Sequence, residues 1–177
     1  SRVEPEFVAR QFSKLGTGNR ITLDHPYLIV MFHPVTTEYN SAYEQAIKVF
    51  GSIYLGIKPK MQVIWMWPNI DAGSHHIYKA VKTQARRSPV PMRFFEHFDQ
   101  DVFTYLLRNS IGIVGNSSCG IREAGFLGIP CIDIGSRQQG REVGPNVKHV
   151  EFDGYEIQKI MGSHLDKRFP NSHIYGD

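Results

Sequence analysis

Two serines and three glycines lie close together in residues 115–125, between an apolar run and a segment with helical spacing. Small residues at a strand-to-helix junction leave backbone N–H groups free, so these groups and the hydroxyls of Ser117 and Ser118 could bind a phosphate. Glu123 lies about a turn and a half into the expected helix, where its carboxylate could accept hydrogen bonds from sugar hydroxyls. Asn and Ser are also preferred N-cap residues, so an ordinary capped helix explains this segment equally well.

The elements that must position this segment alternate along the chain. Apolar runs rich in β-branched or aromatic residues predict five buried strands, at 27–32, 62–67, 92–95, 111–114 and 131–134. Helical spacing predicts helices at 41–55, 74–86, 101–108, 120–127 and 155–165, with a short amphipathic piece at 7–15 and a loop at 16–20 before the first strand. Strand and helix in alternation predict an α/β fold with a parallel sheet covered on both faces.

Polar and glycine-rich clusters follow the carboxyl ends of these strands, at 33–37, 68–74, 116–120 and 135–138. In open parallel α/β sheets, ligands bind at that edge. The loops expected at the opposite edge, 58–60 and 87–91, have the composition of plain solvated turns. The asymmetry predicts a binding site at the carboxyl edge.

Composition narrows the class of protein. With 177 residues and 41% apolar content, the chain can bury one substantial core, which predicts one domain over residues 1–177. The net charge of +3 includes no block of like charge, so nucleic acid is not an expected partner. Cys119 and Cys131 lack partners at zinc-ligand spacing, which predicts free thiols, a cytoplasmic location and no metal. No apolar run approaches the roughly 20 residues that span a bilayer, so no membrane partner is expected.

Four segments, in order, carry a family resemblance: His-Pro-Val-Thr-Thr at 33–37, Pro-Asn-Ile-Asp-Ala-Gly-Ser at 68–74, Gly-Asn-Ser-Ser-Cys-Gly-Ile-Arg-Glu at 115–123 and Gly-Ser-Arg-Gln-Gln-Gly-Arg-Glu at 135–142. They resemble the UDP-N-acetylglucosamine 2-epimerases, specifically the hydrolysing branch that releases N-acetylmannosamine and UDP. The non-hydrolysing branch typically has His-Arg-Arg-Glu-Asn and Asp-Ser-Gly-Gly in the first and third segments. The resemblance implies one Rossmann-like half of a GT-B-type two-domain enzyme, here the C-terminal half, with the N-terminal half and the last helix absent.

The resemblance also implies roles for the nucleotide-binding residues. Ser117 and Ser118 would contact the diphosphate, and Glu123 would accept hydrogen bonds from the ribose. The backbone of Phe98 would read the edge of the base, and Phe103 would stack on uracil. Phe103 is equally well placed to be a core residue.

Three further residues match functional positions of the family. His33 would be the active-site histidine of this half, near the glycosidic oxygen and the diphosphate, where an imidazole can hydrogen-bond or carry a proton. Asn69 would donate to phosphate or sugar oxygens, and Arg137 would neutralise charge on the departing UDP. The alternatives are a histidine that merely ends a strand, an ordinary turn asparagine and a solvated arginine.

The family's reaction eliminates UDP across C1 and C2 to a glycal, after which water adds to give the 2-epimer used for sialic acid or related sugars. It needs no cofactor. The base and the acid at C2 come from the other half, so residues 1–177 alone are expected to be inactive, while the intact enzyme would bind UDP and UDP-N-acetylglucosamine and form homo-oligomers. The alternatives are the nucleotide-sugar-binding half of a GT-B glycosyltransferase and a non-catalytic nucleotide-binding domain.

Overall fold

The computed structural model describes residues 3–33, 39–67 and 74–176. These residues contain seven strands: β1 (Thr17–Gly18), β2 (Tyr27–Met31), β3 (Gln62–Met66), β4 (Met92–Phe95), β5 (Ile113–Gly115), β6 (Cys131–Ile134) and β7 (Val147–Val150). They also contain the helices α1 (Pro5–Lys14), α2 (Tyr39–Gly56), α3 (His75–Ala85), α4 (Gln100–Arg108), α5 (Glu123–Leu127) and α6 (Gly154–His164), and a 3-10 turn, η1 (Ser118–Gly120). All five predicted strands and all five predicted helices are present.

The strands form one sheet in the order β1-β4-β3-β2-β5-β6-β7. All neighbouring pairs from β4 to β7 are parallel, and β1 pairs with β4 antiparallel. The predicted α/β fold with a Rossmann-like parallel sheet is confirmed, with one antiparallel edge strand added. The expected loop at 16–20 was wrong in part, because β1 lies within it and has no apolar run to reveal it. The edge strand β7 was missed because its middle residues are exposed.

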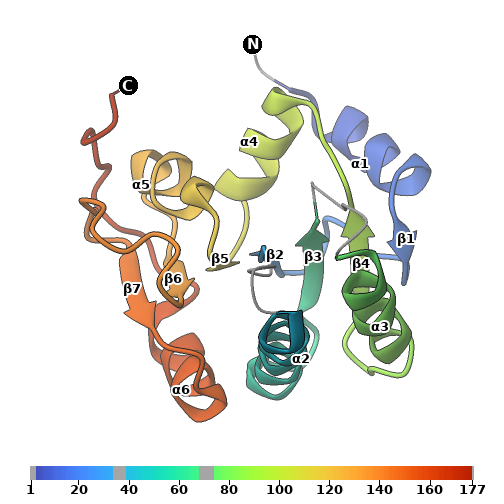
Figure 1. The fold of residues 1–177 in the computed structure, drawn as a ribbon. Helices are drawn as coiled ribbons and strands as arrows, with labels where there is room; N and C mark the ends of the chain where they lie inside the picture. Colours follow the sequence, from blue (N-terminus) through green and yellow to red (C-terminus); the bar gives the residue numbers. More distant parts are fainter. Residues whose placement is uncertain (1–2, 34–38, 68–73, 177) are drawn as a thin grey trace.

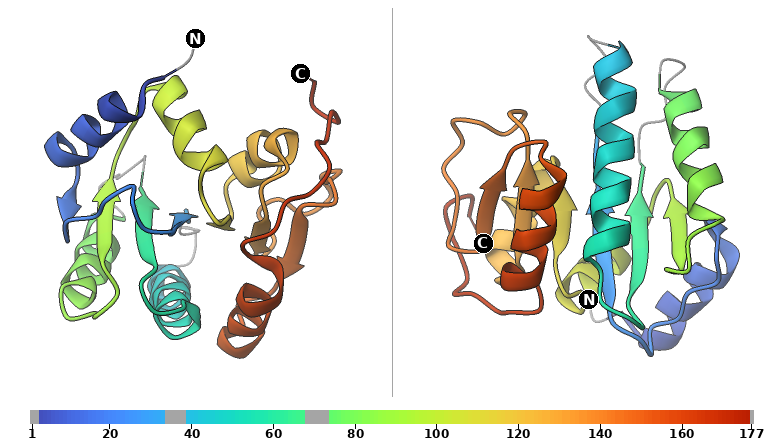
Figure 2. Two further views of the ribbon diagram at one scale, coloured as in Figure 1. Left: turned by 180° about the vertical axis from the view of Figure 1, so that it is seen from behind. Right: turned by 90° about the horizontal axis from the view of Figure 1, so that it is seen from below.

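Two hydrophobic cores lie on the two faces of the sheet, and side chains alternate between them along each strand. Helices α2, α3 and α6 cover one face, where Trp65 stacks on Phe94 with ring centroids 5.6 Å apart. Helices α1, α4 and α5 cover the other face, which includes Ile64 and Met66. Figure 1 shows the two helical layers, and Figure 2 shows them from behind and from below. No helix in the described residues is long and apolar enough to cross a membrane.

The helix expected at 120–127 is divided. The carbonyl oxygen of Gly120 accepts a hydrogen bond from Asn146 Nδ2 (3.3 Å) instead of extending the helical ladder. The regular helix α5 starts at Glu123 and ends at Leu127, and Gly128 caps it with a left-handed φ of 69°. The expected position of Glu123, a turn and a half into a helix, was wrong, because it is the first residue of α5.

Candidate functional site

The strand order reverses between β2 and β5, because the chain runs outward from β2 to β3 and β4 and then returns to β5 beside β2. Such a switch point opens a crevice at the carboxyl ends of the two strands. The half-buried His33 follows β2 at this point, and Asn116 follows β5. Two of the polar loops that the sequence analysis placed at the carboxyl edge therefore lie next to each other there.

The contact between these loops is direct. The backbone N–H of His33 donates to Asn116 Oδ1 (2.7 Å), and Asn116 Nδ2 donates to the His33 carbonyl (2.8 Å). Asn116 is 1% exposed and His33 is half-buried, so both hydrogen bonds are partly shielded from water. The end of β2 is thereby held against the loop that carries Ser117 and Ser118.

The imidazole of His33 is neutral at pH 7. Burial, and to a smaller extent the positive charge of Arg137, lower its pKa from the ordinary 6.5 to about 4. Arg137 is exposed, and its Nη1 lies 3.5 Å from the Asn116 carbonyl oxygen. A neutral imidazole that can donate or accept a hydrogen bond therefore lies near a fixed positive charge.

Ser117 and Ser118 are half-buried at the start of the 3-10 turn after β5, where Ser117 is the N-cap and Ser118 the first residue. The Ser117 hydroxyl accepts a hydrogen bond from the Cys119 N–H (3.3 Å), so it caps the turn, as the alternative interpretation of this segment requires. The first bond of the turn runs from the Gly120 N–H to the Ser117 carbonyl, so the turn itself gives no acceptor to the N–H groups of either serine. The capping hydroxyl and these N–H groups are on the same short loop.

Glu123 is exposed at the start of α5, beside a pocket of about 270 Å³. The pocket is also lined by Arg122 immediately before α5, Arg108 from α4 and Tyr175 from the C-terminal segment. Arg122 lies over the Tyr175 ring, 5.8 Å from its centroid. Two larger pockets, of about 470 and 550 Å³, lie beside α1 and contain none of the predicted site residues.

The two predicted base-contacting residues differ in burial. The Phe98 side chain is buried, with ring centroids 4.6 Å from Phe95 and 5.9 Å from Phe12, so only its backbone is available for the expected contact. Phe103 is half-buried and packs against the core under α4, which leaves part of its ring accessible. Asn69, the remaining predicted residue, lies outside the described residues.

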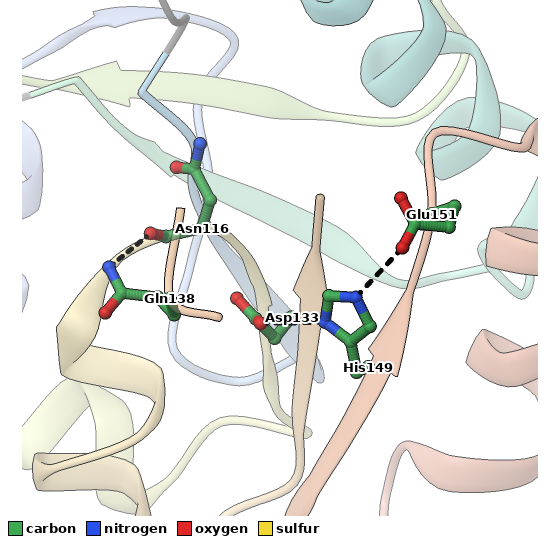
Figure 3. Close-up of polar contacts among 5 residues, drawn as sticks. All are labelled: Asn116, Asp133, Gln138, His149 and Glu151. Atoms are coloured by element: carbon green, nitrogen blue, oxygen red, sulfur yellow. Dashed lines mark hydrogen bonds and ion pairs between the residues drawn. The ribbon is translucent and has the colours of Figure 1, made fainter. Parts of the chain in front are cut away.

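Sequence reasoning missed Asn116 and Gln138, although both lie within motifs that it singled out. Gln138 is buried, and its Nε2 donates to the Asn116 carbonyl (3.0 Å), as Figure 3 shows. Both residues act on backbone groups distant in sequence, and no local pattern indicates such contacts. Their polar side chains in the short loops after predicted buried strands were the available signal.

A second polar cluster joins β6 and β7 (Figure 3). The buried carboxylate of Asp133 contacts His149 Nδ1 at 3.0 Å, and His149 Nε2 lies 3.2 Å from Glu151 Oε1. The hydrogen bond with Asp133 raises the pKa of His149, and burial raises the pKa of Asp133. Within the described residues, no group of three His, Cys, Asp or Glu could hold a metal ion.

Replacing His149 by alanine should lower the free energy of unfolding by about 1 kcal/mol near pH 6, because it leaves the Asp133 carboxylate buried without its partner. A histidine whose pKa is raised on folding stabilises most below its ordinary value of 6.5, and this contribution is lost as the pH rises through the raised value. The penalty should therefore be smaller at about pH 9. Urea unfolding at both pH values measures it, with His97→Ala as the control, because His97 is an exposed histidine outside this cluster. Equal penalties at both pH values would contradict the assignment.

The fold, together with the reversal of strand order between β2 and β5, defines a Rossmann-like α/β domain of the kind that forms one half of GT-B-type enzymes. A family model described as UDP-N-acetylglucosamine 2-epimerase matches residues 5–177. The chain therefore belongs to the UDP-N-acetylglucosamine 2-epimerase family, as the sequence motifs indicated.

Individual relatives agree with this assignment. The UDP-N-acetylglucosamine 2-epimerase of Neisseria meningitidis is 36% identical over 133 residues, covering 74% of this chain and 33% of that protein. The hydrolyzing UDP-N,N'-diacetylbacillosamine 2-epimerase of Legionella pneumophila is 31% identical over 155 residues, covering 87% of this chain and 40% of that protein. The chain thus spans about a third to two fifths of these relatives.

A solved structure supports the fold. The UDP-GlcNAc 2-epimerase of Methanocaldococcus jannaschii matches with a TM-score of 0.70 over 97% of this chain and 46% of that chain. At 19% sequence identity, this likeness concerns the fold alone.

Proposed function

We propose that this chain is the UDP-binding domain of a hydrolysing UDP-N-acetylglucosamine 2-epimerase, which eliminates UDP and hydrates the glycal to N-acetylmannosamine for sialic acid or related sugar synthesis. The observation that carries the proposal is the junction of His33 and Asn116 at the switch point, next to the accessible serines of the 3-10 turn. Family membership supports the reaction class.

In this proposal, the N–H groups and hydroxyls of Ser117 and Ser118 bind the diphosphate, and Arg137 adds positive charge beside it. The neutral imidazole of His33 donates a hydrogen bond toward the glycosidic oxygen as negative charge develops there. Glu123 accepts hydrogen bonds from the ribose hydroxyls.

The two phenylalanines contact the base, and Asn69 contacts another part of the nucleotide sugar. The accessible part of the Phe103 ring stacks on uracil, and the Phe98 backbone contacts the base edge. Asn69 donates to phosphate or sugar oxygens.

We further propose that residues 1–177 form a single nucleotide-binding domain and that the base and acid at C2 belong to a second domain. Proton removal at C2 and reprotonation from the other face need two such groups, and none of the residues assigned above fills either role. The chain alone should accordingly bind nucleotide without turnover. Release of N-acetylmannosamine by the purified chain would refute the proposal that the base and the acid at C2 belong to a second domain.

In this proposal, the domain binds the nucleotide part of the substrate. The name of the Neisseria relative specifies UDP-N-acetylglucosamine, whereas that of the Legionella relative specifies UDP-N,N'-diacetylbacillosamine. Both names contain UDP, and the proposal takes the sugar from the family as a whole.

Calorimetric titration of the chain with UDP tests this proposal directly. UDP should bind, CMP should bind far more weakly, and Ser118→Ala should weaken UDP binding about three- to tenfold through loss of one hydrogen bond. Ser163→Ala is the matched control, because Ser163 is an exposed hydroxyl on α6 that bonds only to its own helix.

Equal affinity for UDP and CMP, or no binding of either, would reject the uridine-nucleotide site. Sugar transfer to an acceptor by the intact protein would instead favour the glycosyltransferase alternative. The family assignment speaks against that alternative, since a glycosyltransferase would share the fold but not the epimerase motifs.

A further inference from the structure

Asn116 uses both ends of its side-chain amide on one other residue. Its Oδ1 accepts from the His33 N–H and its Nδ2 donates to the His33 carbonyl, at 2.7 and 2.8 Å. The parallel pairing of β2 and β5 ends at Met31 and Gly115, and the Asn116 N–H still donates to the Met31 carbonyl (3.2 Å). The side chain therefore replaces the next peptide group of the ladder and extends the pairing to His33.

The backbone of Asn116 is held from the opposite side. Gln138 Nε2 donates to its carbonyl oxygen (3.0 Å), and Arg137 Nη1 lies 3.5 Å from the same oxygen. Gln138 is 7% exposed, and its own Oε1 has no hydrogen-bond partner in the described part of the chain. The loops that follow β2, β5 and β6 thus meet at the buried Asn116. Figure 3 shows Asn116 with Gln138 from the loop after β6.

The chemistry of this junction requires an asparagine. The two His33 groups need one acceptor and one donor on the same planar side chain, which a carboxylate lacks because it has no donor. Alanine would leave the N–H and the carbonyl of His33 unpaired where little water reaches them. A serine hydroxyl is too short to bridge both.

We infer that Asn116 is the positioning residue of this site, holding His33 and the loop of Arg137 in a fixed arrangement around the phosphate-binding turn. The inference rests on the proposed function for the roles of His33 and Arg137. The Asn116 side chain acts on the His33 backbone, the Asn116 carbonyl oxygen accepts from the side chains of Arg137 and Gln138, and Asn116 contacts no reacting group.

The test is an NMR titration of the His33 imidazole in this chain, with the signal assigned by comparison with His33→Gln. In the unaltered chain, His33 should titrate with a pKa of about 4. In Asn116→Ala, His33 loses both backbone hydrogen bonds, so we expect its imidazole to become more exposed to water and to lie farther from Arg137. Because burial and Arg137 are what lower the His33 pKa, this pKa should rise by about one unit or more toward 6.5. UDP affinity should fall about tenfold, because the displaced His33 and Arg137 would lose one to two hydrogen bonds to the nucleotide.

Asn109→Ala is the matched control. Its Nδ2 donates to the Tyr105 carbonyl (2.8 Å) at the exposed end of α4, so its removal also costs a side-chain-to-backbone bond. This variant should leave the His33 titration and UDP affinity unchanged. A purely stabilising role for Asn116 predicts a lower melting temperature with the His33 titration unchanged, and that result would overturn the inference.

If Asn116→Ala does not fold, Asn116→Ser takes its place and must show the same rise in the His33 pKa. The titration needs no nucleotide, so it decides the positioning role separately from the proposed function. Absence of UDP binding by the unaltered chain would refute the function alone. UDP binding with His33 unmoved in the Asn116 variant would refute the positioning role alone.

Discussion

Replacing Gly115 by alanine should lower the free energy of unfolding by about 4 kcal/mol, from strain and overpacking together. Gly115 ends β5 with a φ of 149°, a conformation that side chains rarely adopt. An added Cβ would overlap the Met31 carbonyl oxygen and lie 3.2 Å from the Phe32 nitrogen. These are backbone atoms of the last residue of β2 and of the residue after it, so they cannot move without displacing His33.

Thermal unfolding measures this effect, and the midpoint should fall by about 8–16 °C for a domain of this size. Gly51→Ala is the control, because Gly51 lies within α2 and a Cβ there would meet nothing within 4 Å. The control should be stabilised by about 0.5–1 kcal/mol, since alanine favours a helix over glycine. A Gly115→Ala protein as stable as the original would show that the tight approach of β5 to β2 is not required.

Replacing Glu123 by alanine should weaken UDP binding about 10- to 100-fold, corresponding to about 1.5–3 kcal/mol for hydrogen bonds to a charged group. Glu123 is exposed at the start of α5, where its loss costs little packing. The effect should therefore appear in affinity and not in the melting temperature. Titration calorimetry with UDP measures it.

Two controls make the Glu123 experiment specific. Glu156→Ala removes an exposed acid from the first turn of another helix, α6, and should leave UDP affinity unchanged. Titration with 2'-deoxy-UDP should show a smaller penalty for Glu123→Ala, because one of the hydroxyls that the carboxylate would bind is missing. An equal penalty for both nucleotides would mean that Glu123 does not contact the 2'-hydroxyl.

The central strands and most helices could be predicted because their signals are local. The run of Gln62–Met66 is buried on both faces of the sheet, and its short length and its β-branched and aromatic residues favour a strand. The edge strands lacked that signal, since β1 has two exposed residues and only the last residue of β7 is buried. They became strands because a neighbouring strand offered them hydrogen-bond partners.

The site was predicted in part for the same reason. The loop of Ser117 and Ser118 and the strand-end position of His33 follow from their place after apolar runs. The start of α5 at Glu123 was not foreseen, because the local spacing is continuous from Gly120 to Leu127, whereas the Gly120 carbonyl contacts Asn146, 26 residues away. Phe103 is compatible with both predicted roles, core residue and stacking partner of uracil, since it packs against the core and is only half-buried.

The sequence by itself determined the alternation of strand and helix, the carboxyl edge as the location of the polar loops, and the family, because residue spacing and motifs are properties of neighbouring residues. Only the tertiary structure decided that Asn116 holds His33 across 83 residues of chain and that Asp133 pairs with His149. The physical reason is that a hydrogen bond between strands depends on which strands are adjacent and in which register. That choice is made by the packing of the whole sheet, and no local pattern encodes it.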